Sequence, residues 1–292
     1  MTHDEPAWKA RFRVPLISGV QVAAGAPERG LVASNVSGTF QLHAWDVPSG
    51  RLRALTNRPT GITAGLLSPD GRSVYYHDDT GGNELGHFVR IPFDGGAPAS
   101  ITPGMAGIWS STGGQDVSPK AEGPEHQRFI ERYELQPIDA QTNGPQLFYG
   151  LRYHTRVVKP EAPETFHDQV GYWLWEPATG AILLTLSIPR GQTAMAAGRA
   201  TADAKSFTLE AVRGSLTNGI VSNPFLEQAF RTDRYTIKVD IHADGTWSYE
   251  QDTLLVIPGQ AEPFHHTDRN RLRRIAEPTP NPMALAARGR RA

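Results

Sequence analysis

Apolar and polar residues alternate with a period of two along several runs in the second half of this chain. In the run 151–157 the odd positions carry Leu, Tyr, Thr and Val, and the even positions carry Arg, His and Arg. The run 235–242 alternates in the same way, and Ala243-Asp-Gly245 then supplies a hairpin turn. Neighbouring side chains of a strand point to opposite faces, so each run predicts a half-buried strand.

Repeated strand–turn–strand spacing over about 170 residues predicts an all-β fold built on an antiparallel up-and-down β-barrel of about eight to ten strands. This is the lipocalin or fatty-acid-binding-protein type of barrel, with room inside for one small ligand. We expect its strands over residues 128–135, 147–158, 171–175, 181–188, 206–212, 235–242, 246–257 and 271–275. The segment 219–230 interrupts the alternation and predicts a short helix or a loop over one mouth of the barrel.

The stretch Thr165–Gly180 is the richest in aromatic residues and begins with a histidine, His167. Its alternating aromatic positions predict a buried strand, a tight turn and a returning strand. An aromatic-lined strand beside one imidazole suits a small barrel that holds a flat apolar cofactor. We therefore expect function to reside in the second part of the chain.

Residues 20–102 contain a weak internal repeat. Ala26–Gly30 and Ser68–Arg72 each lead into strand-like runs, and the two starts lie about 42 residues apart. Four strand-like runs in each unit, at that period, are typical of β-propeller blades. We expect three parts: a blade-like β segment over 1–103, a barrel over 104–276 and a disordered tail over 277–292.

The blade-like part resembles the first propeller blades of prolyl-oligopeptidase-type serine peptidases. The matching segments are Ser34–Asp46, Leu67–Gly71 and Asp79–His87. Two blades cannot close a propeller, which typically needs about four to eight. The chain has no Gly-x-Ser-x-Gly sequence, so the nucleophile elbow of such peptidases is missing. We therefore do not expect a serine peptidase.

Composition narrows the classes of function. The chain carries 29 Lys and Arg against 30 Asp and Glu, without the basic excess of nucleic-acid-binding domains. The absence of cysteine excludes disulfides and thiolate metal sites. The N-terminus lacks the apolar segment of a signal peptide, and the longest apolar run, Ala181–Leu186, is too short to span a bilayer. We expect a cytoplasmic protein that binds neither nucleic acid nor a membrane.

Four segments of the second part, taken in order, resemble the nitrobindin-like haem-binding β-barrel family, which is also described as fatty-acid-binding-protein-like. They are Gly107-Ile-Trp109 with Gly113, Phe166–Tyr172, Ile188–Gly191 and Glu262–Arg274. The family opens with Gly-x-Trp-x-Gly-x-Gly, and Ser111 replaces the middle glycine here. Glycine permits close backbone approach to a ligand, so this departure bears on the geometry of the barrel mouth.

The resemblance implies a haem b site with one histidine ligand to iron. The family's ligand lies in the last strand, before a Leu-basic-basic ending, where this chain has His265 and His266 before Leu272. We place the ligand at His266, with His265 as the alternative, because adjacent strand residues face opposite sides and only one can point inward. A surface histidine pair without iron is the competing interpretation.

Further site residues follow from the same resemblance. His167 falls on the distal side, where it could donate a hydrogen bond to an iron-bound diatomic molecule or peroxynitrite; a bond to Asp168 at the strand edge is the alternative. Arg190 falls in a turn that lines the pocket, where it would attract an anionic ligand or a haem propionate, unless it is a solvated turn residue. Tyr172 is expected to pack against the porphyrin, and Trp109 either lines the pocket or fills the barrel floor.

Three functions stay open on these residues. The first is a haem-binding protein with ferric haem b that binds nitric oxide, a diatomic gas, or isomerises peroxynitrite to nitrate. The second is a non-catalytic carrier of a fatty acid or another small apolar ligand. The third is an interaction module derived from a peptidase propeller, whose unpaired strand edges would allow a homodimer.

Overall fold

The computed structural model of the chain describes residues 14–79, 86–100, 105–144 and 146–279. These residues form two compact units, divided at residues 102–103. Apart from one short helix, every regular element within the described ranges is a strand. The expected all-β class is thus confirmed.

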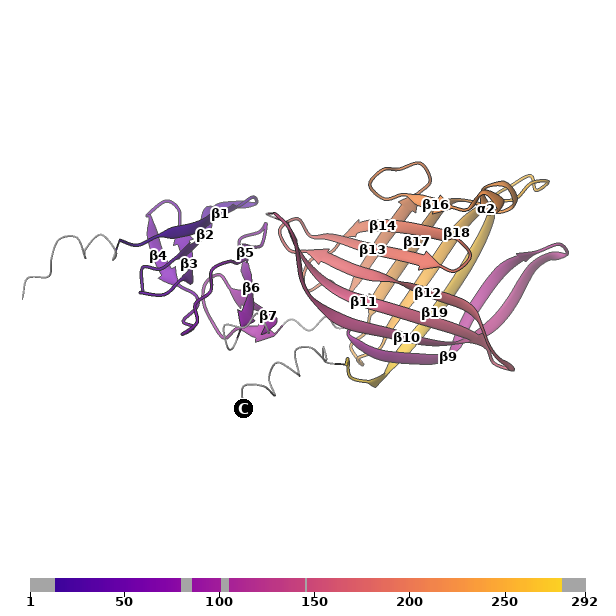
Figure 1. Ribbon diagram of the computed structural model, residues 1–292, viewed down its shortest axis with the longest axis horizontal. Coiled ribbons are helices and arrows are strands. Elements are labelled where there is room, and N and C mark those ends of the chain that lie inside the picture. The colour runs from indigo at the N-terminus through magenta and orange to yellow at the C-terminus, as the bar shows by residue number, and fades with distance from the viewer. Residues whose placement is uncertain (1–13, 80–85, 101–104, 145, 280–292) are drawn as a thin grey trace, which may run out of the picture. The chain divides into compact units, whose positions relative to one another are not determined.

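The first unit contains two four-stranded antiparallel sheets, each with its strands in chain order (Figure 1). The first sheet holds β1 (Ile17–Ala23), β2 (Ala26–Ser34), β3 (Gln41–Asp46) and β4 (Arg51–Ala54). The second holds β5 (Leu66–Leu67), β6 (Ser73–Asp79), β7 (Gly86–Pro92) and β8 (Ala99–Ser100). Apolar side chains of both sheets share one core that includes Leu31, Leu42, Val74 and Val89. The expected four-strand units are present, and their identity as propeller blades stays a prediction.

The second unit is a closed antiparallel barrel. An 11-stranded sheet runs in the order β13-β12-β11-β10-β9-β19-β18-β17-β15-β14-β16, and β13 also pairs with β14, which closes ten of these strands into a ring. Two pairings depart from chain order: β19 pairs with β9, which closes the ring, and β15 pairs with β17, because β16 pairs with β14 instead. The other barrel strands pair with their neighbours in chain order, which confirms the up-and-down topology. The strands are β9 (Gly107–Lys120), β10 (Gly123–Asn143), β11 (Gln146–Lys159), β12 (Ala162–Glu176), β13 (Ala181–Ile188), β14 (Gln192–Arg199), β15 (Ser206–Val212), β16 (Ile220–Ser222), β17 (Arg231–Ile241), β18 (Trp247–Val256) and β19 (Phe264–Ala276).

The alternation read from the sequence fixes which side chains enter the barrel. In β11, Leu151, Tyr153, Thr155 and Val157 are buried and the intervening side chains are more exposed. The predicted hairpin between β17 and β18 is also present: Gly245 has φ 81°, and the His242 amide donates to the Thr246 carbonyl at 2.9 Å. A left-handed φ favours glycine, which explains the residue at this turn.

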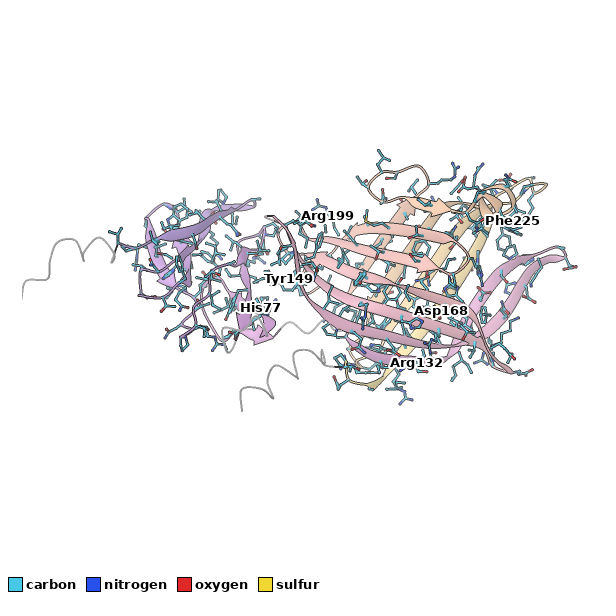
Figure 2. All side chains as sticks on the ribbon, viewed as in Figure 1. His77, Arg132, Tyr149, Asp168, Arg199 and Phe225 are labelled. Carbon is cyan, nitrogen blue, oxygen red and sulfur yellow. The ribbon has the colours of Figure 1, made fainter. Side chains whose placement is uncertain are left out.

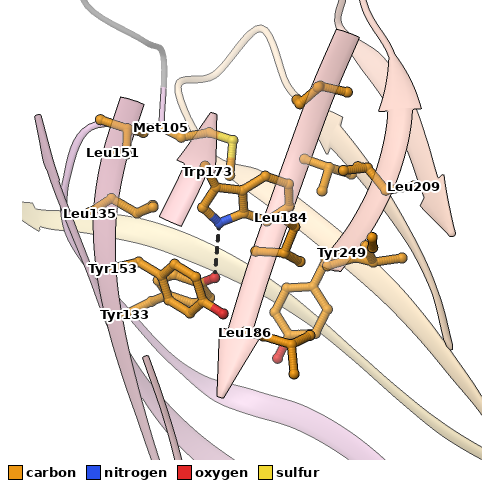
Figure 3. Close-up of a cluster of buried hydrophobic side chains, with 14 of the residues drawn as sticks. Met105, Tyr133, Leu135, Leu151, Tyr153, Trp173, Leu184, Leu186, Leu209 and Tyr249 are labelled. Atoms are coloured by element: carbon orange, nitrogen blue, oxygen red, sulfur yellow. Dashed lines mark hydrogen bonds between the residues drawn. The ribbon is translucent and has the colours of Figure 1, made fainter. Parts of the chain in front are cut away.

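Aromatic and aliphatic side chains fill one end of the barrel, as Figure 3 shows for part of the cluster. Trp109, Trp247, Leu135 and Leu272 are all inaccessible to solvent there. The two indole rings meet edge to face, with their centroids 6.1 Å apart, a favoured arrangement for aromatic pairs. This end forms a solid floor.

The helix α2 (Pro224–Ala229) lies at the other end of the barrel (Figure 1). The Asn223 side-chain oxygen accepts hydrogen bonds from the amides of Phe225 and Leu226 at 2.8 and 3.1 Å, which caps the helix. The predicted interruption of the alternation is therefore a short helix. Its side chains Phe225 and Leu226 line the cavity described below.

Within the described ranges, no helix is long and apolar enough to cross a membrane. The expected tail falls mainly on residues 280–292, which lie outside the described residues. The three-part division at 103 and 276 stays a prediction.

Candidate functional site

The half of the barrel above the floor encloses a cavity of about 510 Å³, within the usual range for small-molecule sites. One wall is apolar and is formed by β13, β14 and β16, with Leu184, Leu186, Ile188, Ala194 and Ile220. The facing strands β9, β10, β18 and β19 contribute acidic, amide and imidazole groups. Phe225 projects at the α2 end of the barrel (Figure 2). The interior is therefore a lined chamber with one polar side.

His266 points into the cavity and His265 points away from it. The His266 side chain is 32% exposed, and its Nε2 lies 2.8 Å from Oδ1 of Asp116. The His265 side chain is 57% exposed on the outer face, where Nδ1 lies 2.8 Å from the Asp252 carboxylate. The period of two along β19 explains this difference. Of the two candidate ligands, the cavity receives His266.

Asp116 and His266 form a largely enclosed ion pair. Burial opposes the charge on His266, but the hydrogen bond and negative charge of Asp116 outweigh it and raise the imidazole pKa. Burial likewise acts to raise the pKa of Asp116, and hydrogen bonds from His266 and Gln127 prevail and lower it. The Gln127 amide donates to Asp116 Oδ2 at 2.8 Å. Both shifts favour the charged pair.

His167 enters the cavity from β12 beside a β-bulge. The pairing of β11 with β12 shifts between Val157 and Val158, and Phe166 is skipped. A bulge re-aims side chains, and here the consecutive residues Phe166 and His167 both line the cavity. Burial, followed by the positive charge of Arg190, lowers the His167 pKa and favours a neutral imidazole.

Polar neighbours surround His167. Its Nε2 lies 3.4 Å from the Gln169 side-chain oxygen, and the Gln169 amide donates to the Tyr153 hydroxyl at 2.8 Å. Asp168 lies on the outer face, with its carboxylate 3.0 Å from Nε2 of His154. The histidine partner of Asp168 is thus His154 and not His167. His167 therefore lies where the sequence places it, inside the pocket.

Arg190 lies in the turn between β13 and β14, at the rim of the cavity. Its guanidinium donates to the Phe166 carbonyl at 2.6 Å, a group that the bulge leaves available. Asn223, the cap of α2, donates to the Arg190 carbonyl at 2.6 Å. These bonds join the rim turn to β12 and to the helix.

One expected contact is wrong, and one open alternative is decided. Tyr172 is 42% exposed on the outer face, because the inward position of this strand belongs to Trp173. Trp173 is buried and its indole N–H donates to the Tyr133 hydroxyl at 3.2 Å (Figure 3). Trp109 lies in the floor below the cavity, where its indole N–H donates to the Met105 carbonyl at 2.7 Å. Of the two roles weighed for Trp109, the structure shows the filled floor.

Glu131 is a cavity residue that the sequence analysis missed. It is 2% exposed, and its carboxylate accepts hydrogen bonds from Thr155, Tyr249 and Asn270 at 2.7, 2.8 and 2.7 Å. Burial raises its pKa against these bonds. Glu131 is two residues after Phe129 and shares its face of the strand, and this alternation was the sequence signal for an inward position.

Asp268 was missed as well. Its side chain is half-buried and lines the cavity two residues beyond His266, on the same face of β19. Burial raises its pKa to about 7, with the nearby acids Glu131 and Asp116 adding to the shift. The Gln251 amide donates to its Oδ1 at 2.9 Å.

The described residues contain no group of three or more His, Cys, Asp or Glu that could hold a metal ion by themselves. Haem needs less from the protein, because the porphyrin supplies four ligands and a single imidazole can serve as an axial one. An apolar wall, a chamber of suitable size and His266 opposite that wall fit such a group. Asp116 bonds Nε2 of His266 at 2.8 Å, whereas the carboxylate that often accompanies a ligating histidine bonds the other ring nitrogen.

The chain is similar to a solved structure and matches a family model. Among solved structures, Rv2717c from M. tuberculosis aligns with 22% identity and a TM-score of 0.40, over 59% of this chain and 93% of that one. No curated protein matches the chain. Residues 102–274, which contain most of the closed barrel, match the family model of the THAP4-like heme-binding β-barrel domain, the nitrobindin-like family that the sequence motifs indicate. Since the match covers more than half of the 292 residues, the chain belongs to the THAP4-like heme-binding β-barrel family.

Proposed function

We propose that the barrel cavity binds ferric haem b through His266, and that the loaded protein binds nitric oxide or isomerises peroxynitrite to nitrate. One observation carries this proposal: His266 projects from the last strand into a chamber whose opposite wall is apolar. A porphyrin face requires that combination of one nitrogen donor and a broad apolar surface.

Bound haem would supply a redox-active iron with an open coordination position, and the protein controls access and ligation. His266 would hold the haem through its imidazole nitrogen. His167 is held largely neutral by burial and can offer an N–H to an oxygen atom of a small ligand. Phe225 and Leu226 of α2 cover part of the mouth and limit the entry of water.

The fatty-acid carrier fits the cavity less well. A fatty-acid carboxylate inside the barrel would need a cationic partner, and Arg190 is the sole arginine among the described lining residues. It lies at the rim, whereas the interior presents the acids Asp116, Glu131 and Asp268. Self-association through the first unit stays a prediction.

A hemin titration of the purified full-length chain tests the proposal. The native protein should develop a shifted Soret band with one equivalent of hemin, and His266→Ala should lose it or weaken it at least tenfold. His265→Ala is the matched control from the next position on the strand and should retain the native spectrum. Equal spectra for all three proteins would reject His266 as the ligand.

The proposed reaction needs a second measurement. Hemin-loaded protein mixed with peroxynitrite in a stopped-flow instrument should speed its decay and raise the nitrate yield, whereas hemin-free protein should not. His167→Ala should slow this reaction more than it weakens hemin binding. Decay rates equal to those of the hemin-free protein would leave haem binding without isomerase activity.

A further inference from the structure

Asp116 lies directly beside the proposed iron ligand and fixes its orientation. In the register between β19 and β9, Asp116 is opposite Asp268, and His266 is the next inward residue toward the mouth. Diagonal neighbours on adjoining strands lie within reach of long side chains. The imidazole of His266 therefore reaches the adjoining strand β9, where its tip atom Nε2 lies 2.8 Å from the Asp116 carboxylate.

A second bond immobilises the carboxylate. Gln127 is directly opposite Asp116 on β10 and donates to Oδ2 at 2.8 Å, so Oδ1 remains for His266. The Asp116 side chain is only 9% exposed. Ser118 adds a further side-chain hydrogen bond to Asp116. The Asp116–His266 bond is a charge-assisted one, which is about twice as strong as a neutral bond.

The nitrogen that Asp116 holds is also the one that would reach an iron atom most freely. Nε2 is at the tip of the ring, whereas Nδ1 is bonded to the ring carbon that carries Cβ and therefore lies closer to the backbone. We propose that Asp116 is a positioning residue that competes with haem iron for Nε2 of His266, so that loading requires this hydrogen bond to open. The inference rests on the proposed haem site and adds to it a residue that restrains ligation.

Asp116→Asn tests the competition with little change in shape. The asparagine oxygen can still accept a bond, but a neutral one is weaker, so Nε2 is released more readily. We expect Asp116→Asn to bind hemin about tenfold more tightly and to associate faster than the native protein. Unchanged or weaker hemin binding by Asp116→Asn would overturn the competition.

Two further experiments distinguish the competition by Asp116 from the proposed haem site. In the hemin-free protein, ¹⁵N NMR of the imidazoles should show a hydrogen-bonded Nε2 at His266, and that signal should shift in Asp116→Asn and not in the outer-face control Asp252→Asn. In the His266→Ala background, Asp116→Asn should no longer raise hemin affinity. An Asp116 effect that persists without His266 contradicts the competition and leaves the haem site standing. If neither native protein nor Asp116→Asn binds hemin while the NMR bond is intact, both the haem site and the competition are contradicted.

Discussion

The buried carboxyl of Asp268 should make the stability of the hemin-free barrel depend on pH. Its folded pKa is about 7 against a model value of 3.8, so the folded protein holds this proton more tightly than the unfolded chain. The resulting stabilisation is fully present below about pH 4 and is lost as pH rises toward 7. About three pKa units at 1.36 kcal/mol each give a change of up to about 4 kcal/mol in the free energy of unfolding.

Asp268→Asn removes the titration and keeps the acceptor for Gln251, which donates at 2.9 Å in the native protein. Urea unfolding followed by tryptophan fluorescence, between pH 4.5 and 8, measures the difference between variant and native protein. We expect the variant to gain relative stability steadily up to about pH 7 and to remain constant above it. Asp244→Asn is the control, since hydrogen bonds from Thr246 lower the pKa of that exposed carboxyl. If the difference in the free energy of unfolding between Asp268→Asn and native protein does not vary with pH, the pKa of Asp268 is not raised by folding.

Three other predictions concern packing and organisation. Glu131→Ala should lower the free energy of unfolding by at least about 2 kcal/mol, measured in urea, because it leaves three buried donors without their acceptor; an unchanged midpoint would contradict this. Gly171→Ala should cost about 1–3 kcal/mol in the same assay, because the added carbon would lie 1.9 Å from the Thr185 carbonyl oxygen. The matched control is Gly113→Ala, whose added carbon would lie 3.8 Å from the Ser111 hydroxyl, and equal costs for the two variants would contradict this. Limited proteolysis should cut between residues 95 and 106 and leave a stable C-terminal barrel, and resistance across that stretch would argue against separate units.

The strands of the barrel were predictable where the alternation of apolar and polar side chains agrees with the strand propensity of the residues. Leu151 and Tyr153, with their charged neighbours, fix both the strand and its inward face, and His266 follows from the same rule. Two strands of the ten-stranded ring were missed because their residues are poor strand formers by propensity. β9 carries Gly113 and Gly114, and β14 is rich in alanine. Packing accounts for the small residues: a side chain at Gly198 of β14 would lie 2.2 Å from the Thr208 carbonyl oxygen.

The site was only partly predictable for a related reason. The period of two along a strand tells which residues share a face. It does not tell which face is inward when both faces carry aromatic residues. Tyr172 was therefore predicted to face inward, although Trp173 occupies the inward position. Contacts between distant strands, such as the one between Asp116 and His266, depend on barrel closure, which no local pattern encodes. Glu131 shows that an acidic residue within an alternating series can lie at an inward position even where charge alone suggests solvent exposure.

Chemical rescue shows whether His266 binds haem iron through its ring nitrogen inside the barrel. His266→Gly leaves a space of imidazole size and can be loaded with hemin in the presence and absence of free imidazole. Added imidazole should restore the native Soret spectrum of His266→Gly and leave the spectrum of His265→Gly unchanged. A native-like spectrum of His266→Gly without imidazole would rule out His266 as the iron ligand.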